Sequence, residues 1–295
     1  MNREMYEIVK NNKGFIAALD QSGGSSGKTL ALYGIGQDQY STDDEMFALI
    51  HEMRKRVFTS KVFTNEHILG TILFEKTMLS KVGDKFTADY LWDEKKIVSF
   101  LKVDKGLKDE ENGVKLMKDM PSLVETLQVA REKNIFGTKM RSVIYSANPV
   151  GIKAVVDQQF EIAKVICENG LVPIIEPEVD INSPEKELCE KILKEEVVNH
   201  LNNWNPEHKI MFKFTIPSVP NHYLDLYNYD CVVRIVALSG GYTNEKACEL
   251  LALNNNMIAS FSRALLEGLT YQQTDEEFDN KLDDSIKKIY EASIT

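Results

Sequence analysis

Residues 148–170, N-P-V-G-I-K-A-V-V-D-Q-Q-F-E-I-A-K-V-I-C-E-N-G, lead directly into residues 171–178, L-V-P-I-I-E-P-E. Asn148 can cap a helix in which Pro149 takes the first position, and apolar side chains then recur every three or four residues until Gly170. The residues after Gly170 form a short apolar run of strand length. This stretch therefore predicts a helix followed at once by a buried strand, which is the repeating unit of an α/β fold.

Eight short runs rich in apolar and β-branched residues lie along the chain, and helical periodicity marks most of the segments between them. The runs are Phe15 to Leu19, Ile68 to Phe74, Val98 to Val103, Ile135 to Met140, Leu171 to Ile175, Ile210 to Phe214, Val232 to Leu238, and Met257 to Ser260. This pattern predicts a parallel sheet wrapped by helices, and eight is the strand number of a (β/α)₈ TIM barrel.

Three further helices are indicated by local signals. The segment between the first two runs is long and predicts a helix near Asp43 to Val57. Ser183 with Pro184 predicts another helix start, and Thr274 with Glu277 forms a capping box before a C-terminal helix. No Pro- or Ser-rich linker and no internal repeat is visible, so we expect residues 1–295 to form a single domain.

Composition argues against a nucleic-acid-binding protein and against a membrane protein. The chain has 35 Lys and Arg against 45 Asp and Glu, and its net charge of −10 argues against nucleic acid as a partner. The first ten residues are charged, and no segment has the roughly eighteen apolar residues of a membrane span, so we expect a soluble, cytoplasmic protein without membrane association. The outward helix faces of a barrel leave a homo-oligomer open.

The four cysteines and five histidines are scattered along the chain. None of them forms a C-x-x-C, H-x-H or H-E-x-x-H spacing. The cysteines therefore fit reduced core thiols, and we expect neither a metal site nor another cofactor.

Ionisable and small polar residues gather where the eight runs end, and in a barrel that edge carries the active site. Run by run, these residues are Asp20, Glu75, Lys102, Lys139 with Arg141, Glu176 with Glu178, Lys213, Ser239, and Ser260 with Arg263. Any one of them could face solvent. Residues two apart share a face, however, and burying so many charges is costly unless they neutralise one another or a bound anion. The pattern therefore predicts a charged substrate.

Lys213 stands in I-M-F-K-F-T-I-P, among apolar and aromatic neighbours. Burial there would lower the pKa of its ammonium, and Lys139 on a nearby strand would act in the same direction. A neutral amine can attack a ketone, so Lys213 is the candidate nucleophile. The alternative is a lysine that extends from the strand to the rim of the barrel.

Glu176, in I-I-E-P-E, is the candidate for proton transfer. Burial would raise its pKa and nearby cations would lower it, so the sign of the shift stays open at this stage. For Glu178 we favour a supporting role as the ion-pair partner that holds Arg141 or Lys139.

Two sites for phosphate groups are indicated. Ser239-Gly240-Gly241 follows the seventh run and precedes a helix start near Thr243, and Arg263 follows the eighth run, as in the phosphate sites of many barrels. The second is D-Q-S-G-G-S-S after the first run, with Ser22, Ser25 and Lys28, and with Lys102 opposite. A plain turn and a flexible linker are the alternatives. Two phosphate sites at one barrel mouth would fit a bisphosphate.

At these residues the sequence resembles the class I fructose-bisphosphate aldolases, and most closely their shorter bacterial form. The matching motifs run in order from about Gly14 to Leu265. They are G-F-I-A-A-L-D-Q-S, F-L-K-V-D-K-G, G-T-K-M-R, G-L-V-P-I-I-E-P-E and A-L-S-G-G. The resemblance implies a (β/α)₈ barrel that cleaves fructose 1,6-bisphosphate reversibly into glycerone phosphate and glyceraldehyde 3-phosphate.

The resemblance also implies roles for single residues. Lys213 would form the Schiff base, Glu176 would transfer protons, Asp20 would take the proton of the C4 hydroxyl, and Lys139 would assist with hydrogen bonds. The remaining implied roles are the phosphate on C1 for Ser239, Gly240, Gly241, Ser260 and Arg263, the phosphate on C6 for Ser22, Ser25 and Lys102, and charged support for Arg141 and Glu178.

The chain departs from the animal members of this family at three places. Gln21 stands where they have an acidic residue, and Thr29, beside Lys28, stands where they have an arginine. The chain also ends in A-S-I-T rather than in a tail with a terminal tyrosine. The first two departures concern the C6-phosphate site, and the third concerns the group that exchanges the C3 proton.

Two alternatives to this function remain from the sequence. One is a Schiff-base aldolase for another ketose phosphate or a deoxy sugar phosphate. The other is a barrel that binds a sugar phosphate without catalysis.

Overall fold

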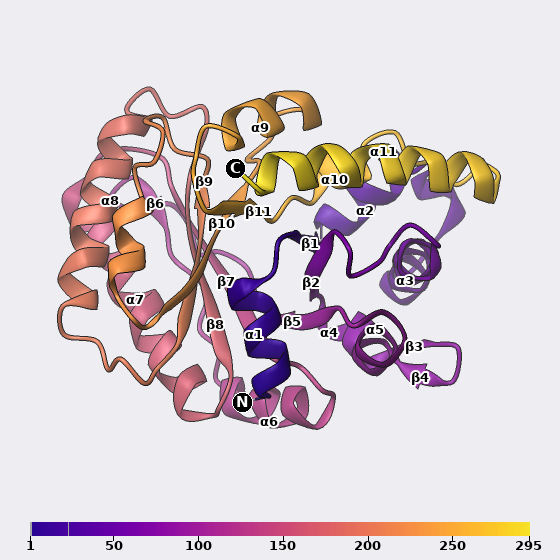
Figure 1. The fold of residues 1–295 in the computed structure, drawn as a ribbon, viewed down its shortest axis with the longest axis horizontal. Helices are drawn as coiled ribbons and strands as arrows, with labels where there is room; N and C mark the ends of the chain where they lie inside the picture. Colours follow the sequence, from indigo (N-terminus) through magenta and orange to yellow (C-terminus); the bar gives the residue numbers. More distant parts are fainter. Residues whose placement is uncertain (1, 23) are drawn as a thin grey trace.

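The computed structural model describes residues 2–22 and 24–295 and contains a barrel of eight parallel strands (Figure 1). Neighbouring strands pair in the order β1, β2, β5, β7, β8, β9, β10, β11. Their bounds are Phe15–Leu19, Ile68–Leu73, Val98–Lys102, Gly137–Ile144, Val172–Val179, Ile210–Thr215, Val232–Leu238 and Met257–Ala259. The predicted (β/α)₈ barrel is therefore confirmed.

Helices wrap the strands, with α7 and α8 on one side of the barrel and α3 and α5 on the other (Figure 1). The α-helices are α1 Arg3–Asn11, α2 Gly24–Leu32, α3 Asp43–Thr59, α4 Glu75–Leu79, α5 Thr87–Lys95, α6 Leu123–Glu132, α7 Pro149–Glu168, α8 Lys186–Leu201, α9 Asn244–Leu251, α10 Arg263–Leu266 and α11 Asp275–Ser293. The short elements are the 3₁₀ turns η1 Gln37–Gln39 and η2 Leu224–Asn228 and the strands β3 Lys81–Val82, β4 Lys85–Phe86 and β6 Val114–Lys115.

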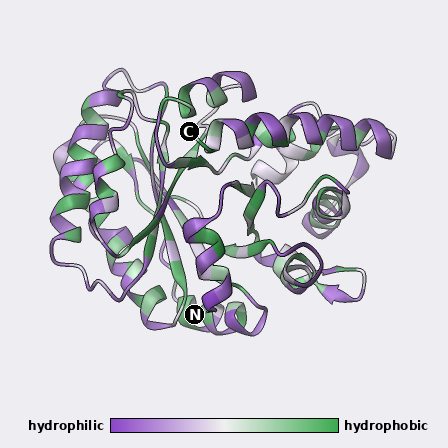
Figure 2. Ribbon diagram, viewed as in Figure 1, coloured by the Kyte–Doolittle hydropathy of each residue, from purple (hydrophilic) through white to green (hydrophobic). Residues whose placement is uncertain are grey.

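The core has two layers, one inside the barrel and one between the strands and the helices. Apolar residues concentrate on the strands, and polar residues on the outer faces of the helices (Figure 2). Helix α1 belongs to the inner layer, because Met5 and Val9 pack with residues at the starts of the strands, such as Val98 and Val172. Arg234 anchors this helix through a hydrogen bond to the carbonyl of Val9 (2.9 Å). The amino end of the barrel is thus plugged, and the opposite end is open to solvent.

Two strands are longer than the sequence predicted. β7 and β8 continue past Met140 and Ile175 to Ile144 and Val179, and Arg141 pairs in register with Glu176. Apolar content alone placed their ends too early, because charged residues in these strands are paired with one another rather than solvated.

The predicted helix starts are largely confirmed. Thr42 and Thr274 both form capping boxes, and α3 and α11 begin one residue after them. The helix predicted at Ser183 and Pro184 is present, but it begins later than predicted, at Lys186, because Pro184 and Glu185 form a turn before it. Of the predicted D-Q-S-G-G-S-S loop, Gly23 lies outside the described residues, and α2 begins at Gly24, so this segment is not a flexible linker.

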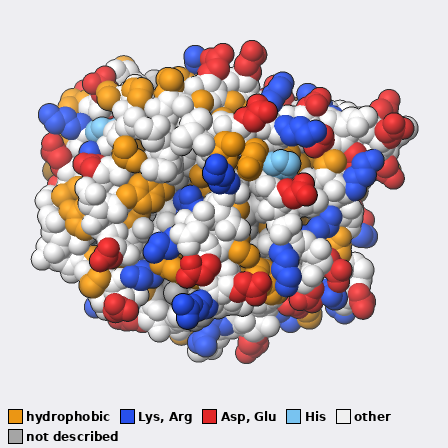
Figure 3. Space-filling view, viewed as in Figure 1, with side chains coloured by type: hydrophobic (Ala, Val, Ile, Leu, Met, Phe, Trp, Pro, Cys, Tyr) orange, Lys and Arg blue, Asp and Glu red, His pale blue; other side chains and the backbone are white. Residues whose placement is uncertain are grey.

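Acidic and basic side chains are interspersed over the face seen in Figure 3. None of the helices within residues 2–22 and 24–295 combines the length and the apolar character that crossing a membrane requires.

Candidate active site

A cavity of about 460 Å³ opens at the carboxyl ends of the strands. Every predicted site residue except Gly241 lines it: Asp20, Ser22, Ser25, Lys102, Lys139, Arg141, Glu176, Glu178, Lys213, Ser239, Gly240, Ser260 and Arg263. Glu75, at the end of the second run, does not belong to it, because it begins α4 and pairs with Lys105 at the surface (2.9 Å). The cavity has the size and position of a small-molecule site.

Four charged side chains alternate in sign at the floor of this cavity. The Nζ atom of Lys139 lies 2.7 Å from Oδ2 of Asp20 and 2.8 Å from Oε2 of Glu176. The Nζ atom of Lys213 lies 3.1 Å from Oε1 of the same glutamate. Only 4% of Lys213 is exposed, so this lysine does not extend to the barrel rim. Together these two cations and two carboxylates are neutral, which offsets the cost of burying them.

The two oxygens of Glu176 face different lysines. Although Oε2 of Glu176 lies 2.8 Å from Nζ of Lys139, it makes no hydrogen bond of good angle within the described residues. Glu176 therefore contacts Lys213 with one oxygen and forms an ion pair with Lys139 through the other.

The pKa values in this cluster reflect two opposing effects, burial and the charges of neighbouring side chains. Burial raises the pKa of Asp20, but Lys139, Lys213 and Lys102 outweigh it, and the net pKa lies well below the ordinary value. Burial likewise raises the pKa of Glu176, and the attraction of Lys139, Lys213 and Arg141 makes the net pKa lower than usual. Burial lowers the pKa of Lys139, while Asp20 and Glu176 raise it above its ordinary value. Both carboxylates are therefore ionised at neutral pH.

Glu176 and Lys213 meet where the ladder between β8 and β9 opens. The backbone pairing of these strands ends at Ile175 with Phe212. Beyond it, Oε1 of Gln159 on α7 accepts a hydrogen bond from the amide of Glu176 (2.9 Å). The hydroxyl of Thr215 accepts from the amide of Val179 (3.0 Å) and donates to its carbonyl (2.6 Å). Hydrogen bonds to side chains thus replace ladder bonds at this point.

The Ser239-Gly240-Gly241 segment forms a tight turn before α9. Gly240 and Gly241 have φ of +62° and +119°, and a Cβ atom on Gly240 would lie 2.6 Å from Cγ2 of Ile181. A Cβ atom on Gly241 would lie 3.6 Å from Nη2 of Arg263, so this guanidinium lies beside the turn. Ser260 is almost fully buried, and its hydroxyl has no partner within the described residues. This corner combines a cation, a glycine turn and a helix start, as anion sites do.

The comparisons with known proteins agree with this geometry. Residues 1–219 match the family model described as "Fructose-bisphosphate aldolase class-I". The "Fructose-bisphosphate aldolase class 1" of Clostridium acetobutylicum is 59% identical over 295 residues, and the match covers 100% of both chains. The chain belongs to the class I fructose-bisphosphate aldolases. It is therefore a lyase of glycolysis, as that family is.

A solved structure of fructose-bisphosphate aldolase from Plasmodium falciparum, in complex with TRAP and a small molecule inhibitor, has the same fold as this aldolase. The two superpose with a TM-score of 0.78 over 98% of this chain and 92% of that chain, at 18% identity.

Glu178 pairs with Arg141 rather than with Lys139, which settles the choice that the sequence left open for this residue. Arg141 is about one third exposed at its side chain and lies at the edge of the aldolase cavity, whereas Glu178 is largely buried. The pair therefore supports the rim of the site.

Asp104 is a site residue that sequence reasoning missed. Its Oδ1 atom lies 2.8 Å from Nζ of Lys102, which also donates a hydrogen bond to the Asp104 carbonyl (2.9 Å). Asp104 is buried and lines the aldolase cavity. The signal was present in the motif K-V-D-K, two residues after Lys102. Part of the positive charge predicted at Lys102 is therefore neutralised.

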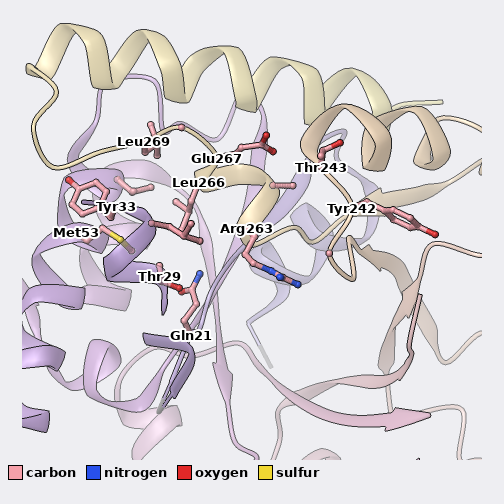
Figure 4. A pocket seen from close by; sticks show the side chains of 15 residues that line it. Gln21, Thr29, Tyr33, Met53, Tyr242, Thr243, Arg263, Leu266, Glu267 and Leu269 are labelled. Atoms are coloured by element: carbon pink, nitrogen blue, oxygen red, sulfur yellow. The ribbon is translucent and has the colours of Figure 1, made fainter. Parts of the chain in front are cut away.

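Gly241 was predicted in the same cavity but lines a second one of about 280 Å³ beside it (Figure 4). This neighbouring cavity is mostly apolar, with Tyr33, Met53 and Leu266 in its wall. Arg263 borders both cavities. The charged cluster of Asp20, Lys139, Glu176 and Lys213 lies in the larger cavity.

Proposed function

We propose that this aldolase cleaves fructose 1,6-bisphosphate reversibly through a Schiff base on Lys213. The observation that carries the proposal is the position of the Lys213 amine, which is buried at the cavity floor and 3.1 Å from a carboxylate oxygen of Glu176. That carboxylate can accept the proton that the ammonium must lose before the nitrogen attacks a ketone.

The contacts support a sequence of proton transfers. The amine of Lys213 adds to the C2 carbonyl, and Glu176 returns a proton to the carbinolamine hydroxyl, which leaves as water. The iminium that results draws the electrons of the C3–C4 bond as that bond breaks. Asp20, ionised in the free protein, takes the proton of the C4 hydroxyl, and glyceraldehyde 3-phosphate leaves. Protonation of the enamine at C3 and hydrolysis of the imine then release glycerone phosphate.

Lys139 is proposed to organise the two acid–base groups rather than to react. Its ammonium lies within 2.8 Å of carboxylate oxygens of both Asp20 and Glu176, so it fixes their separation. It can also donate a hydrogen bond to a hydroxyl of the sugar.

We propose that the two phosphate groups occupy opposite sides of the cavity. The C1 phosphate is assigned to Ser239, Gly240, Gly241, Ser260 and Arg263, and the C6 phosphate to Ser22, Ser25 and Lys102. The first assignment is supported by the glycine turn beside Arg263. For the second, Ser25 caps the turn by accepting from the Ser22 amide (2.9 Å), and Lys28 and Thr29 also line the cavity.

Borohydride trapping tests the nucleophile. Reduction in the presence of fructose 1,6-bisphosphate should inactivate the enzyme and leave one adduct on the peptide that contains Lys213, and prior treatment with EDTA should not change this result. An unmodified Lys213, or an adduct on another lysine, would disprove the assignment. A barrel that only binds sugar phosphate would give no adduct at all.

Substrate comparison tests the C6 site. We expect kcat/KM for fructose 1,6-bisphosphate to exceed that for fructose 1-phosphate. Equal values would remove the proposed C6-phosphate site and favour a monophosphate or deoxy sugar phosphate as the substrate.

We also propose that residues 1–295 act as one domain in the cytoplasm, where a glycolytic enzyme finds its sugar phosphate substrate. One cooperative unfolding transition and recovery in the cytosolic fraction of the cell would support this, and the molar mass in solution would show whether a homo-oligomer forms.

A further inference from the structure

The barrel has a seam between its first and last strands. Within the described residues, ladder pairing runs from β1 around to β11, and no ladder joins those two strands. A single backbone hydrogen bond crosses the seam here, from the amide of Ala18 to the carbonyl of Phe261 (3.0 Å). Asp20 leaves β1 on one side of this seam, and Arg263 begins α10 on the other. The distance between Asp20, the proposed acid–base group, and Arg263, the proposed phosphate ligand, therefore depends on the contacts that cross the seam.

Gln21 bridges the seam with its side chain. Its Nε2 atom donates a hydrogen bond to Oγ of Ser262 (2.6 Å). Gln21 follows Asp20 directly, and Ser262 precedes Arg263. In Figure 4 the side chain of Gln21 reaches toward the segment that carries Arg263. The bridge thus joins the two loops at the positions next to the functional residues.

Arg54 on α3 forms hydrogen bonds with Gln21, the residue that bridges the seam. Its Nη2 atom donates to the carbonyl of Gln21 (2.6 Å) and to Oε1 of the Gln21 side chain (3.2 Å). Its Nη1 atom donates to Oγ1 of Thr77 (2.6 Å). An amide side chain has one accepting and one donating end, so the guanidinium that engages Oε1 leaves Nε2 pointing toward Ser262. Arg54 therefore sets both the backbone and the side-chain orientation of Gln21.

The guanidinium of Arg54 is an unusual group to bury here. The residue is fully buried, and no carboxylate within the described residues lies close enough to form a salt bridge with it. Burial lowers its pKa to about 10, which the negative charge of Asp20 opposes. A buried charge without an ion-pair partner is costly, and an apolar side chain would pack in the same space at less cost. Stability therefore does not explain why an arginine stands at this position.

We propose that Arg54 is a positioning residue for the aldolase reaction, which acts through Gln21 and Ser262 to set the placement of Asp20 relative to Arg263. This inference rests on the roles proposed above for those two residues. Arg54 does not line the cavity, so it does not contact the substrate.

Steady-state kinetics of Arg54→Lys test the inference. Lysine keeps the positive charge, but a single ammonium cannot reproduce the planar fork that engages Thr77 and both acceptors of Gln21. We expect kcat/KM to fall by roughly 10- to 100-fold, with a higher KM and a lower kcat, because displaced catalytic groups cost rate. Both fructose 1,6-bisphosphate and fructose 1-phosphate should lose kcat/KM, since both substrates use Asp20 and Arg263. A loss confined to the bisphosphate would overturn the inference.

Arg56→Lys is the matched control. Arg56 lies on the same helix but bonds to Tyr33, Gln273 and Asp275, and it lines neither cavity. This substitution should lower the melting temperature without changing kcat/KM. If Arg56→Lys reduced kcat/KM as much as Arg54→Lys, the effect would be general destabilisation and the inference would be wrong.

A double-mutant cycle tests the route through the bridge. Ser262→Ala removes the acceptor of Gln21, so its effect and that of Arg54→Lys should not add. Additive losses, or a kcat/KM in Arg54→Lys within about twofold of the unmodified enzyme, would overturn the inference. If Arg54→Lys does not fold, Ser262→Ala and Gln21→Met must each reproduce the loss of kcat/KM, and normal kinetics in both would overturn it.

Borohydride trapping shows whether a negative result contradicts this inference or the proposed function. Lys213 lies on β9, away from the seam, so Arg54→Lys should still form the reduced adduct at Lys213. An adduct with unchanged kinetics would refute only the role of Arg54, whereas loss of trapping in the unmodified enzyme would refute the proposed function.

Discussion

At the scale of single residues, the site is a neutral chain of alternating charges from Asp20 through Lys139 and Glu176 to Lys213. Each member neutralises its neighbours, and each also has a proposed part in the reaction, as a reacting group or, for Lys139, as the group that positions two others. Removing one charge therefore changes the ionisation of the others as well as the reaction.

Lys213→Met is the direct test of the nucleophile. Methionine has a similar length and leaves no large void, so the fold should persist, while turnover should fall by roughly 10⁴-fold or more. Circular dichroism and activity measured on the same preparation check both parts. Substantial residual activity would mean that another group attacks the ketone.

The pH dependence of stability follows from the lowered pKa values of Asp20 and Glu176. A carboxyl group whose folded pKa is depressed stabilises the fold above its unfolded pKa, near 4, and this contribution is lost as the pH falls toward the folded value. Urea unfolding between pH 3 and pH 7 should therefore show a stability that declines below about pH 4. Asp20→Asn should flatten that decline, and an unchanged slope in this variant would contradict the assignment.

At the scale of elements, the strand ends and the turns after them set the positions of the functional groups. β7 and β8 carry their charges inside the strands, whereas the turn after β10 and the start of α10 offer an arginine and a glycine corner. The strands are held by ladders and core packing, so the loops are the elements that a substitution can change most selectively.

Gly240→Ala tests the glycine turn. Its φ of +62° and the approach of Ile181 leave no room for a Cβ atom, so the turn must shift. We expect a loss of roughly 1–2 kcal/mol in stability and a KM raised about tenfold for a phosphorylated ketose. Gly83→Ala is the matched control, because Gly83 has a φ of +65° with nothing within 4 Å of a Cβ atom. It should lose stability alone, and a normal KM in Gly240→Ala would remove this turn from the phosphate site.

At the scale of the whole molecule, a protein of net charge −10 has a cavity lined by six Lys and Arg side chains and only four Asp and Glu side chains. Acidic residues predominate on the rest of the protein, whereas cations predominate in this concave site. This charge distribution directs anionic substrates to the barrel mouth. The closed amino end, plugged by α1, makes that mouth the access route for the substrate.

Much of this aldolase follows from local sequence. The eight strands, most helix starts and the charged strand ends were predictable, because periodicity, capping and the cost of burying charge act over a few residues. The family motifs added the roles that we propose for Lys213 and Glu176.

The tertiary structure alone shows which charged groups meet and which other side chains hold them in place. The pairing of Lys139 with two carboxylates depends on the register between strands. The contacts of Gln159 with strand β8 and of Arg54 with the loop after β1 depend on how helices pack against the barrel. No local pattern encodes these contacts, because a hydrogen bond across the barrel exists only once the closed sheet brings its two partners within reach.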